Sequence, residues 1–385
     1  MKFETKAIRI QTERSQHREH STPIHPTSSF VFNSAEQMQN VFSGEEDGNI
    51  YSRFTNPSVE EFQTKLAALE GTEACMATAT GMAAVFTSLM AYLKKGDHII
   101  ASRAIFGSSF QVISQTLPEY GISCSFVDPN KIETWHESVR QNSKMLFLES
   151  PSNPGLELID LEKASTFAKE HKLLLNIDNC FATPYLQQPA KWGADIITHS
   201  ATKFIDGQGR VMGGAILGSK EVVEKAYLFI RRTGPSLSPF NAWILSKSLE
   251  TLAVRMDRHC SNAMALAQWL ENHEKVKKVN YPFLQSHPQY EIAKKQMSQG
   301  GGIVTFEIDG NLEDGIKFLN SLKMLSLTAN LGDSRSIASH PASTTHLRVP
   351  EEDRLKLGIT NSLIRISTGL EHIDDIIADI DQALL

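Results

Sequence analysis

The stretch Asp195-Ile-Ile-Thr-His-Ser-Ala-Thr-Lys-Phe204 decides the fold and the chemistry that this chain of 385 residues can support. It starts as an apolar run typical of a buried strand and ends in small hydroxyl residues beside one lysine, Lys203. Ligands lie at the carboxyl ends of strands in α/β sheets, because the loops there meet at a crevice. A lysine shielded from water at such a strand end has a lowered pKa and can act as a nucleophilic amine. Lys203 is therefore the first candidate for a catalytic residue.

The hydroxyl groups that precede Lys203 narrow the kind of ligand. Ser200 and Thr202 lie within three residues of the lysine, and their hydroxyls suit the oxygens of a phosphate. We therefore expect Lys203 to form a Schiff base with pyridoxal 5'-phosphate, while Ser200 and Thr202 hold the phosphate of this cofactor. The alternative is a solvated surface lysine next to a Ser/Thr turn.

Short apolar runs on both sides of this stretch alternate with stretches of helical periodicity. The runs are Asp97–Ser102, Cys124–Val127, Met145–Glu149, Leu173–Asp178, Asp195–Thr198 and Gly214–Leu217. Strands that alternate with helices predict an α/β fold with a mostly parallel central sheet that is covered on both faces. Functional residues should then gather at the carboxyl ends of these runs.

Asp178 ends one of these runs and is the second informative residue. The segment Leu173-Leu-Leu-Asn-Ile177 leads directly into its carboxylate. A carboxylate is costly to bury unless it meets a cation. The protonated ring nitrogen of pyridoxal phosphate is such a cation, and the pairing keeps the ring an electron sink. Asp178 is therefore predicted to hold the ring nitrogen.

Two loops upstream could reach the phosphate. Small residues around Gly81 and Met82 lead into a helix, where free backbone N–H groups favour an anion. Tyr51 and Arg53 lie in the Gly/Asn/Pro-flanked segment Gly48–Pro57, and both can present polar groups to a phosphate. The alternatives are close packing through Gly81 and an ordinary surface loop around Tyr51.

The pattern changes after Gly214. A Gly/Pro/Ser-rich break at Arg231–Pro239 precedes a long helical stretch from about Phe240 to Glu271. We expect three parts: an N-terminal arm over residues 1–50 that contacts a neighbouring subunit, a large cofactor-binding α/β domain over 51–248, and a smaller α+β domain over 249–385.

Composition and charge exclude several classes of function. A net charge of −6 and a pI of about 6.1 argue against nucleic acid as a partner. No apolar run approaches the ~20 residues of a membrane span, and the first residues lack an apolar signal core. The four cysteines form no Cys-x-x-Cys pair. The cysteine pattern predicts no metal site and a reducing cytoplasm. Together with the charge and the lack of a long apolar run, it predicts a cytoplasmic protein with neither nucleic acid nor membrane as partner.

Taken together, the motifs resemble the Cys/Met-metabolism family of pyridoxal-phosphate enzymes. The motifs are Tyr51-Ser-Arg53, Gly81-Met82, Asp178, Ser200-Ala-Thr-Lys203 and Leu363-Ile-Arg-Ile-Ser367. The resemblance runs from about residue 5 to the C-terminus. It implies an aspartate-aminotransferase-like fold of type I and a homotetramer built as a dimer of dimers, with active sites shared across each dimer.

The resemblance also implies roles for individual residues. The counterparts of Tyr51 and Arg53 reach the phosphate of the neighbouring subunit, and that of Asn153 contacts the ring hydroxyl. Arg365 would bind the α-carboxylate of the substrate, in keeping with a bidentate guanidinium–carboxylate pair, and Asn330 is a further expected substrate contact.

Two residues indicate a branch within the family. Phe106 stands where most members carry a tyrosine stacked on the cofactor, so it keeps the stacking and lacks the phenol. A thiol with a pKa of about 8.5 needs an acid to leave, whereas a carboxylate with a pKa of about 4 does not. Arg335 stands where cystathionine-handling members usually carry a glutamate, and it could attract a succinyl carboxylate. These residues favour γ-replacement of O-succinylhomoserine by sulfide to give homocysteine and succinate, as part of methionine biosynthesis.

Three alternatives remain open at this point. Cystathionine γ-synthase shares every motif except Phe106 and Arg335. A C–S γ-lyase is a further possibility, although Ser108 stands where methionine γ-lyases carry a cysteine. A non-catalytic phosphate- or nucleotide-binding α/β protein would need neither Lys203 nor Asp178. The sequence leaves open whether the acyl group is succinyl or acetyl.

Overall fold

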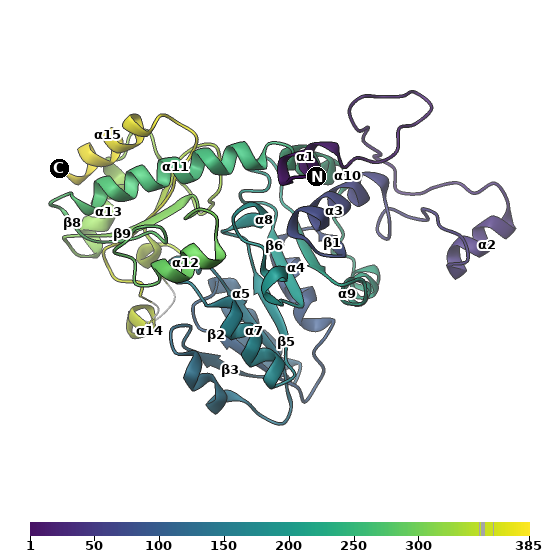
Figure 1. Cartoon of the computed structure of the whole chain (residues 1–385), viewed down its shortest axis with the longest axis horizontal. Coiled ribbons are helices and arrows are strands. Elements are labelled where there is room, and N and C mark those ends of the chain that lie inside the picture. The colour runs from purple at the N-terminus through teal and green to yellow at the C-terminus, as the bar shows by residue number, and fades with distance from the viewer. Residues whose placement is uncertain (346, 348–350, 357) are drawn as a thin grey trace.

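The computed structural model describes residues 1–345, 347, 351–356 and 358–385 and arranges them around two β-sheets (Figure 1). The larger sheet has seven strands in the order β1-β7-β6-β5-β4-β2-β3. They are β1 (Ala74–Thr78), β2 (His98–Ser102), β3 (Ser123–Val127), β4 (Ser143–Glu149), β5 (Leu174–Asp178), β6 (Ile196–Ser200) and β7 (Gly214–Gly218). Within this sheet β7 runs antiparallel to both of its neighbours, β1 and β6, and the other four strand pairs are parallel. The predicted mostly parallel sheet is therefore confirmed.

Helices cover both faces of the large sheet. Successive side chains of a strand point to opposite faces, so each strand contributes to the core on both sides. Ile99 of β2 packs with α4 (Gly81–Met90) and α9 (Lys220–Thr233), whereas Ile100 packs with α7 (Leu161–Glu170) and Trp135 of the 3₁₀-helix η2 (Ile132–Ser138). Further helices on the α7 side are α3 (Pro57–Glu70) and α8 (Thr183–Leu186), and α5 (Gly107–Gln111), η1 (Val112–Thr116) and α6 (Leu117–Glu119) lie on the α4 side. The continuous apolar runs in the sequence follow from this double coverage.

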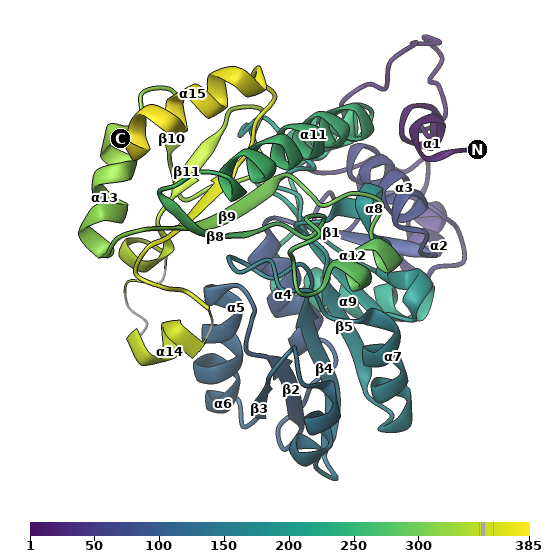
Figure 2. The same ribbon diagram turned by 60° about the vertical axis from the view of Figure 1, so that its left-hand side comes forward.

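The smaller sheet has five strands in the order β10-β11-β12-β9-β8. They are β8 (Val276–Asn280), β9 (Ile303–Ile308), β10 (Ser326–Leu327), β11 (Ile337–Ser339) and β12 (Leu363–Ser367). The helices α11 (Leu252–Glu271), α13 (Leu312–Ser321) and α15 (Ile373–Leu384) pack with it around Phe306 and Ile364. Figure 2 shows these helices and strands grouped apart from the strands of the large sheet. This half of the chain has the expected α+β character.

The long helix expected from Phe240 to Glu271 is wrong, because the structure divides it into α10 (Pro239–Leu249) and α11. Thr251 has φ −110° and ψ 5°, outside the helical region. At the break the Ser248 carbonyl accepts hydrogen bonds of 3.2 Å from the N–H and the hydroxyl of Thr251 and one of 2.9 Å from Arg255. The break lies beside the expected boundary between residues 248 and 249, which we retain as a proposal.

Sequence periodicity missed several short or edge elements. They are β1, β8, β11 and α9, together with α1 (Phe3–Arg9), α2 (Ala35–Ser43), η3 (Pro189–Trp192), α12 (Tyr290–Gln296), η4 (Pro341–Ser343) and α14 (Glu351–Lys356). β8 shows why: its burial alternates weakly, with Lys277 and Lys278 exposed in the middle of the strand. An edge strand of that kind carries too little apolar signal for a sequence pattern to find.

The first fifty residues lie partly against the body and partly away from it: α1 packs on the core through Ala7, whereas α2 stands apart. Figure 1 shows α2 on a long excursion at one side of the molecule, linked back to α3 by an irregular segment. Val31 is 99% exposed, and Met38 and Phe42 of α2 are also exposed. Apolar side chains displayed in this way suit an arm that packs on another subunit. Among the described residues, no helix is both long and apolar enough to span a bilayer.

Candidate active site

Lys203 follows β6 and points toward the loop before β11. Its Nζ donates a hydrogen bond of 2.7 Å to Oδ1 of Asn330. Burial lowers the pKa of Lys203; the nearby thiol of Cys180 opposes this effect, and the positive charge of Arg365 adds to it. A lysine with a lowered pKa holds a larger fraction of free amine at neutral pH, which is the form that attacks a carbonyl. The structure thus gives Lys203 the environment that the sequence predicts.

Asp178 lies at the end of β5, next to Glu149 of β4 in the sheet register. Burial raises the pKa of Asp178 to about 6, although a bond from the Cys180 N–H and the nearby His199 oppose the shift. That bond is 3.0 Å long. Among the described residues no lysine or arginine forms an ion pair with Asp178. A half-buried carboxylate that no lysine or arginine neutralises fits the protonated ring nitrogen of pyridoxal phosphate.

The end of β6 and the start of α4 bring together Ser200 and Gly81, two residues of the predicted phosphate site. A Cβ on Gly81 would lie 2.5 Å from Cβ of Ser200, so only glycine allows this approach. The Ser200 side chain lies beside the N-terminus of α4, whose N–H groups favour an anion. In contrast, Thr202 Oγ1 already bonds to the N–H and C=O of Gly213, at 3.1 and 3.2 Å. Met82 contacts the Ser109 hydroxyl through its sulfur at 3.9 Å.

Arg365 of β12 forms the other side of the site. It is 3% exposed, and burial lowers its pKa to about 10, which leaves it charged at neutral pH. Its guanidinium donates to Asn153 Oδ1 at 2.9 Å and to the Asn330 carbonyl at 3.3 Å. Its Nε is buried without a partner. A buried guanidinium that meets only neutral oxygens suits the carboxylate of a substrate.

Glu149 was not predicted and supports two of the predicted residues. It accepts a hydrogen bond of 2.7 Å from the backbone N–H of Phe106 and a second one from that of Asn153. Burial, and then the charge of Asp178, raise its pKa well above the usual value. Glu149 ends an apolar run just as Asp178 does, and that shared position was the signal available in the sequence. We infer that it positions the aromatic ring and the amide.

A second missed group lies beneath the site. His199 of β6 contacts the buried carboxylate of Glu70 at 2.7 Å, and Asn179 donates to the same carboxylate at 3.2 Å. These residues connect the C-terminal end of α3 with the strand that ends in Ser200. Their sequence separation prevented their recognition as a group.

Three predicted residues lie away from Lys203 within one chain. Tyr51 is 41% exposed, and the guanidinium of Arg53 lies 4.7 Å from the ring of Phe54 and donates to the Arg231 carbonyl. Arg335 is exposed, with Nε 2.9 Å from Asp333 Oδ1 and Nη2 3.1 Å from the Gln208 carbonyl. In the described part of the chain none of the three contacts Lys203 or Asp178.

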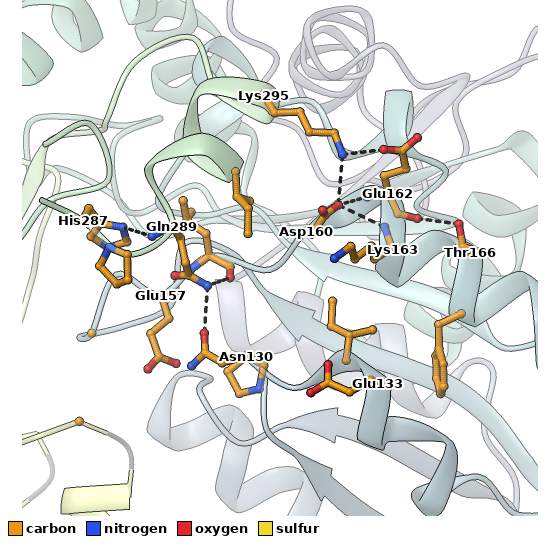
Figure 3. A pocket seen from close by; sticks show the side chains of 18 of the residues that line it. Asn130, Glu133, Glu157, Asp160, Glu162, Lys163, Thr166, His287, Gln289 and Lys295 are labelled. Carbon is orange, nitrogen blue, oxygen red and sulfur yellow. Dashed lines mark hydrogen bonds and ion pairs between the residues drawn. The ribbon is translucent and has the colours of Figure 1, made fainter. Parts of the chain in front are cut away.

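A cleft of about 980 Å³ lies elsewhere, between the region of α7 and that of α12 (Figure 3). None of the predicted site residues lines it. Gln289 crosses it and bonds to Asn130 at 2.9 Å, while Lys295 pairs with Asp160 at 3.5 Å and with Glu162 (Figure 3). Its walls are charged and solvated, so its size alone does not make it the catalytic site.

Comparisons with known proteins agree with this geometry. The family model described as Cys/Met metabolism PLP-dependent enzyme matches residues 4–385. An O-succinylhomoserine sulfhydrylase of Pseudomonas aeruginosa is 44% identical over 382 residues, which cover 99% of this chain and 95% of that protein. An L-methionine gamma-lyase of Fusobacterium nucleatum subsp. polymorphum is 40% identical over 383 residues, covering 99% of this chain and 97% of that protein.

A solved structure gives the same result for the fold and the cofactor. A crystal structure of a Campylobacter jejuni protein, described as an O-acetylhomoserine (thiol)-lyase, matches with a TM-score of 0.96 and 35% identity. The match covers 100% of both chains, and that structure contains N'-pyridoxyl-lysine-5'-monophosphate. The fold of type I and the cofactor pyridoxal phosphate, both predicted from the sequence, are confirmed.

The raised pKa of Asp178 predicts a trade between stability and cofactor binding. A carboxyl whose pKa rises on folding does not change the free energy of unfolding below about pH 4, where it is protonated in both states. Above about pH 6 it lowers the free energy of unfolding by the full amount. Asp178→Asn should therefore stabilise the cofactor-free protein at pH 7.5 by roughly 1–3 kcal/mol and weaken its hold on pyridoxal phosphate. Thermal melts of the cofactor-free protein and a cofactor titration measure both effects.

The exposed Asp375 on α15 provides the control, since Asp375→Asn should leave cofactor affinity unchanged. Melting temperatures of Asp178→Asn that equal those of the wild type at both pH 4 and pH 7.5 would contradict a buried, uncompensated carboxylate.

Proposed function

The chain belongs to the Cys/Met metabolism family of pyridoxal-phosphate-dependent enzymes, and within it we propose a transferase, an O-succinylhomoserine sulfhydrylase. It would join O-succinylhomoserine and hydrogen sulfide to give homocysteine and succinate. Phe106 carries the proposal: it precedes α5, its backbone N–H bonds to Glu149, and its ring has no phenol. A site without that acid suits a carboxylate leaving group, which departs unprotonated, better than a thiol.

The residues around the cofactor would hold it on three sides. Asp178 would pair with the ring nitrogen, Ser200 and the N-terminus of α4 with the phosphate, and Asn153 with the ring hydroxyl. Phe106 would cover one face of the ring. When bound, pyridoxal phosphate supplies an electron sink for the carbon atoms next to the substrate amine.

Lys203 would move protons once the substrate amine has taken its place. Its lowered pKa allows it to accept a proton from the α carbon at neutral pH and to deliver protons along the chain of the substrate. Asn330 would orient the amine, since it accepts the bond from Nζ. Succinate then leaves from the γ carbon, and sulfide adds there.

Arg365 would fix the substrate by its α-carboxylate. The bonds to Asn153 and Asn330 hold the guanidinium in place, and the unpartnered Nε remains available. A preorganised guanidinium of this kind binds a carboxylate in a fixed direction.

Arg335 would read the acyl group. It belongs to the same loop as Asn330, whose side chain bonds to Lys203. Its guanidinium bonds to Asp333 of that loop. It is exposed and can turn from Asp333 to a succinyl carboxylate. An acetyl ester has no second carboxylate and would not use this contact.

We further propose a homotetramer, a dimer of dimers in which Tyr51 and Arg53 serve the phosphate of the neighbouring subunit. The extended arm and its exposed apolar side chains support a shared interface. The four free cysteines among the described residues suit a reducing compartment such as the cytoplasm.

Replacement of Lys203 tests the central assignment. Lys203→Ala should abolish turnover and the absorbance of lysine-bound cofactor, because no other amine is held in its place. Borohydride reduction of the wild type, followed by peptide mass analysis, should label Lys203. Labelling of a different lysine, or a retained absorbance in the variant, would show the assignment to be wrong.

Mixed subunits test the shared site. Arg53→Ala and Lys203→Ala chains, each inactive alone, should regain activity when exchanged, because one site of a mixed dimer has both residues intact. Two differently tagged chains, co-purified, measure the exchange directly. If verified mixed dimers stay inactive, Arg53 does not serve the neighbouring site.

Assays with two esters and two sulfur donors test the reaction and the role of Arg335. Loss of a charge-assisted hydrogen bond costs roughly 1.5–3 kcal/mol, which is about tenfold to a hundredfold in kcat/KM. Arg335→Ala should show this loss with O-succinylhomoserine and little loss with O-acetylhomoserine, whereas Arg335→Lys should retain part of the preference.

The same assays separate the alternatives. Arg335→Glu should admit cysteine as a sulfur donor, because a glutamate can hold the distal ammonium. Efficient use of cysteine by the wild type would indicate cystathionine γ-synthase, and breakdown of methionine as the main reaction would indicate a lyase. Equal losses on both esters would mean that Arg335 only supports its loop.

A further inference from the structure

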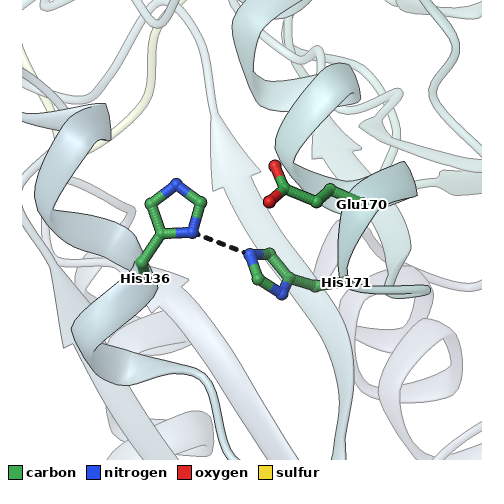
Figure 4. A group of neighbouring side chains, drawn as sticks. All are labelled: His136, Glu170 and His171. Carbon is green, nitrogen blue, oxygen red and sulfur yellow. Dashed lines mark hydrogen bonds between the residues drawn. The ribbon is translucent and has the colours of Figure 1, made fainter.

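A group of three metal-ligating side chains lies on the surface, away from the predicted active-site residues. His136 of η2 and the pair Glu170 and His171 at the end of α7 place one donor atom each within 4.8 Å of the others. Nδ1 of His136 and Nε2 of His171 are 2.8 Å apart although the residues are 35 positions apart in the chain. Figure 4 shows the two rings facing each other with the Glu170 carboxylate beside them. Within the described residues this is the only group of such closeness.

Buried aromatic rings fix the two histidines in this arrangement. The ring of Phe167 lies 5.1 Å from that of His136 and 4.7 Å from that of His171. Trp135, which is fully buried, packs edge-on against Phe167 at 5.5 Å and donates from its indole nitrogen to the Asp128 carbonyl at 2.7 Å. The core thus holds η2 against α7, and the imidazoles do not need to be ordered when a ligand binds.

The local charge favours a cation at this position. His171 is the C-cap of α7, and the carbonyl end of a helix carries a partial negative charge. Glu170 forms no ion pair within the described part of the chain, so its carboxylate is free to act as a ligand. His136 and Glu170 also line the cleft of Figure 3, whose walls hold five carboxylate residues and three lysines.

We propose that His136, Glu170 and His171 bind one divalent transition-metal ion, with zinc as the best match. Two imidazoles and a carboxylate are a known zinc ligand set, and a water would fill the fourth position. Zn–N bonds of about 2.0–2.1 Å place two tetrahedral ligand nitrogens about 3.3 Å apart. The two nitrogens need to separate only slightly from their distance of 2.8 Å, and the rings must turn so that both nitrogens point at the ion. The ion would replace the shared proton and link η2 to α7.

Zinc content and thermal stability test the proposal on the tag-free holoenzyme. The protein is stripped with a chelator, dialysed against zinc chloride and analysed for zinc per chain, with cofactor absorbance as a check on folding. The wild type should take up one ion more per chain than the His136→Ala/His171→Ala double variant. Glu170→Gln should weaken binding about tenfold or more. Zinc should raise the melting temperature of the wild type and leave that of the double variant unchanged.

His20→Ala is the matched control, because His20 is an exposed histidine of the N-terminal arm outside this group. It should keep the extra ion and the shift in melting temperature. If the double variant alters folding, Glu170→Gln and the single His136→Ala, both at exposed residues, give the same comparison. An equal zinc content in wild type and folded variants, or no zinc-dependent shift in the wild type, would overturn the proposal.

Discussion

The hydrogen bond between Lys203 and Asn330 is the interaction on which the candidate site depends, because it joins the loops of the two sheets. Lys203 comes from the end of β6, whereas Asn330 precedes β11 in the smaller sheet. Arg365 of β12 strengthens this junction through the Asn330 carbonyl and Asn153. Gly332 allows the approach: its φ is +73°, and a Cβ there would lie 2.5 Å from the Phe204 nitrogen. Neither sheet carries a complete site alone.

The charged groups at this junction are poorly compensated by the chain itself. Burial is the largest cause of the pKa shift at Asp178, Glu149, Lys203 and Arg365, and in each case it favours the neutral form. Such an arrangement lowers the stability of the cofactor-free protein. It also means that a cationic ring nitrogen at Asp178 and a carboxylate at Arg365 gain more than they would in water. A lower stability of the cofactor-free protein and a gain in ligand binding would thus have one physical origin.

The sequence predicted the parts of the fold that follow from local pattern. The runs Leu173–Asp178 and Asp195–Thr198 correspond to the central strands β5 and β6, whose apolar signal was readable. The positions of Asp178 and Ser200 at the carboxyl ends of these strands were readable as well. Glu149 and the pair of His199 and Glu70 were missed because their importance depends on which backbone N–H groups and side chains the fold brings to them. The histidines of the proposed zinc site were missed for the same reason, since their spacing is set by the packing of Trp135 and Phe167.

Proteins similar to this chain carry different named activities. Relatives at 44% and 40% identity are named as a sulfhydrylase and a lyase, although both align over 99% of this chain. We propose that the shared scaffold provides the cofactor chemistry common to both, with residues such as Lys203 and Asp178. The two activities then differ in whether the leaving group needs a proton and in whether the far end of the substrate carries a charge. We propose that Phe106 and Arg335 address these two questions, because neither takes part in the bonds among Lys203, Asn330, Arg365 and Asn153, although Arg335 also donates to the Gln208 carbonyl. Substrate choice can then change without loss of the fold.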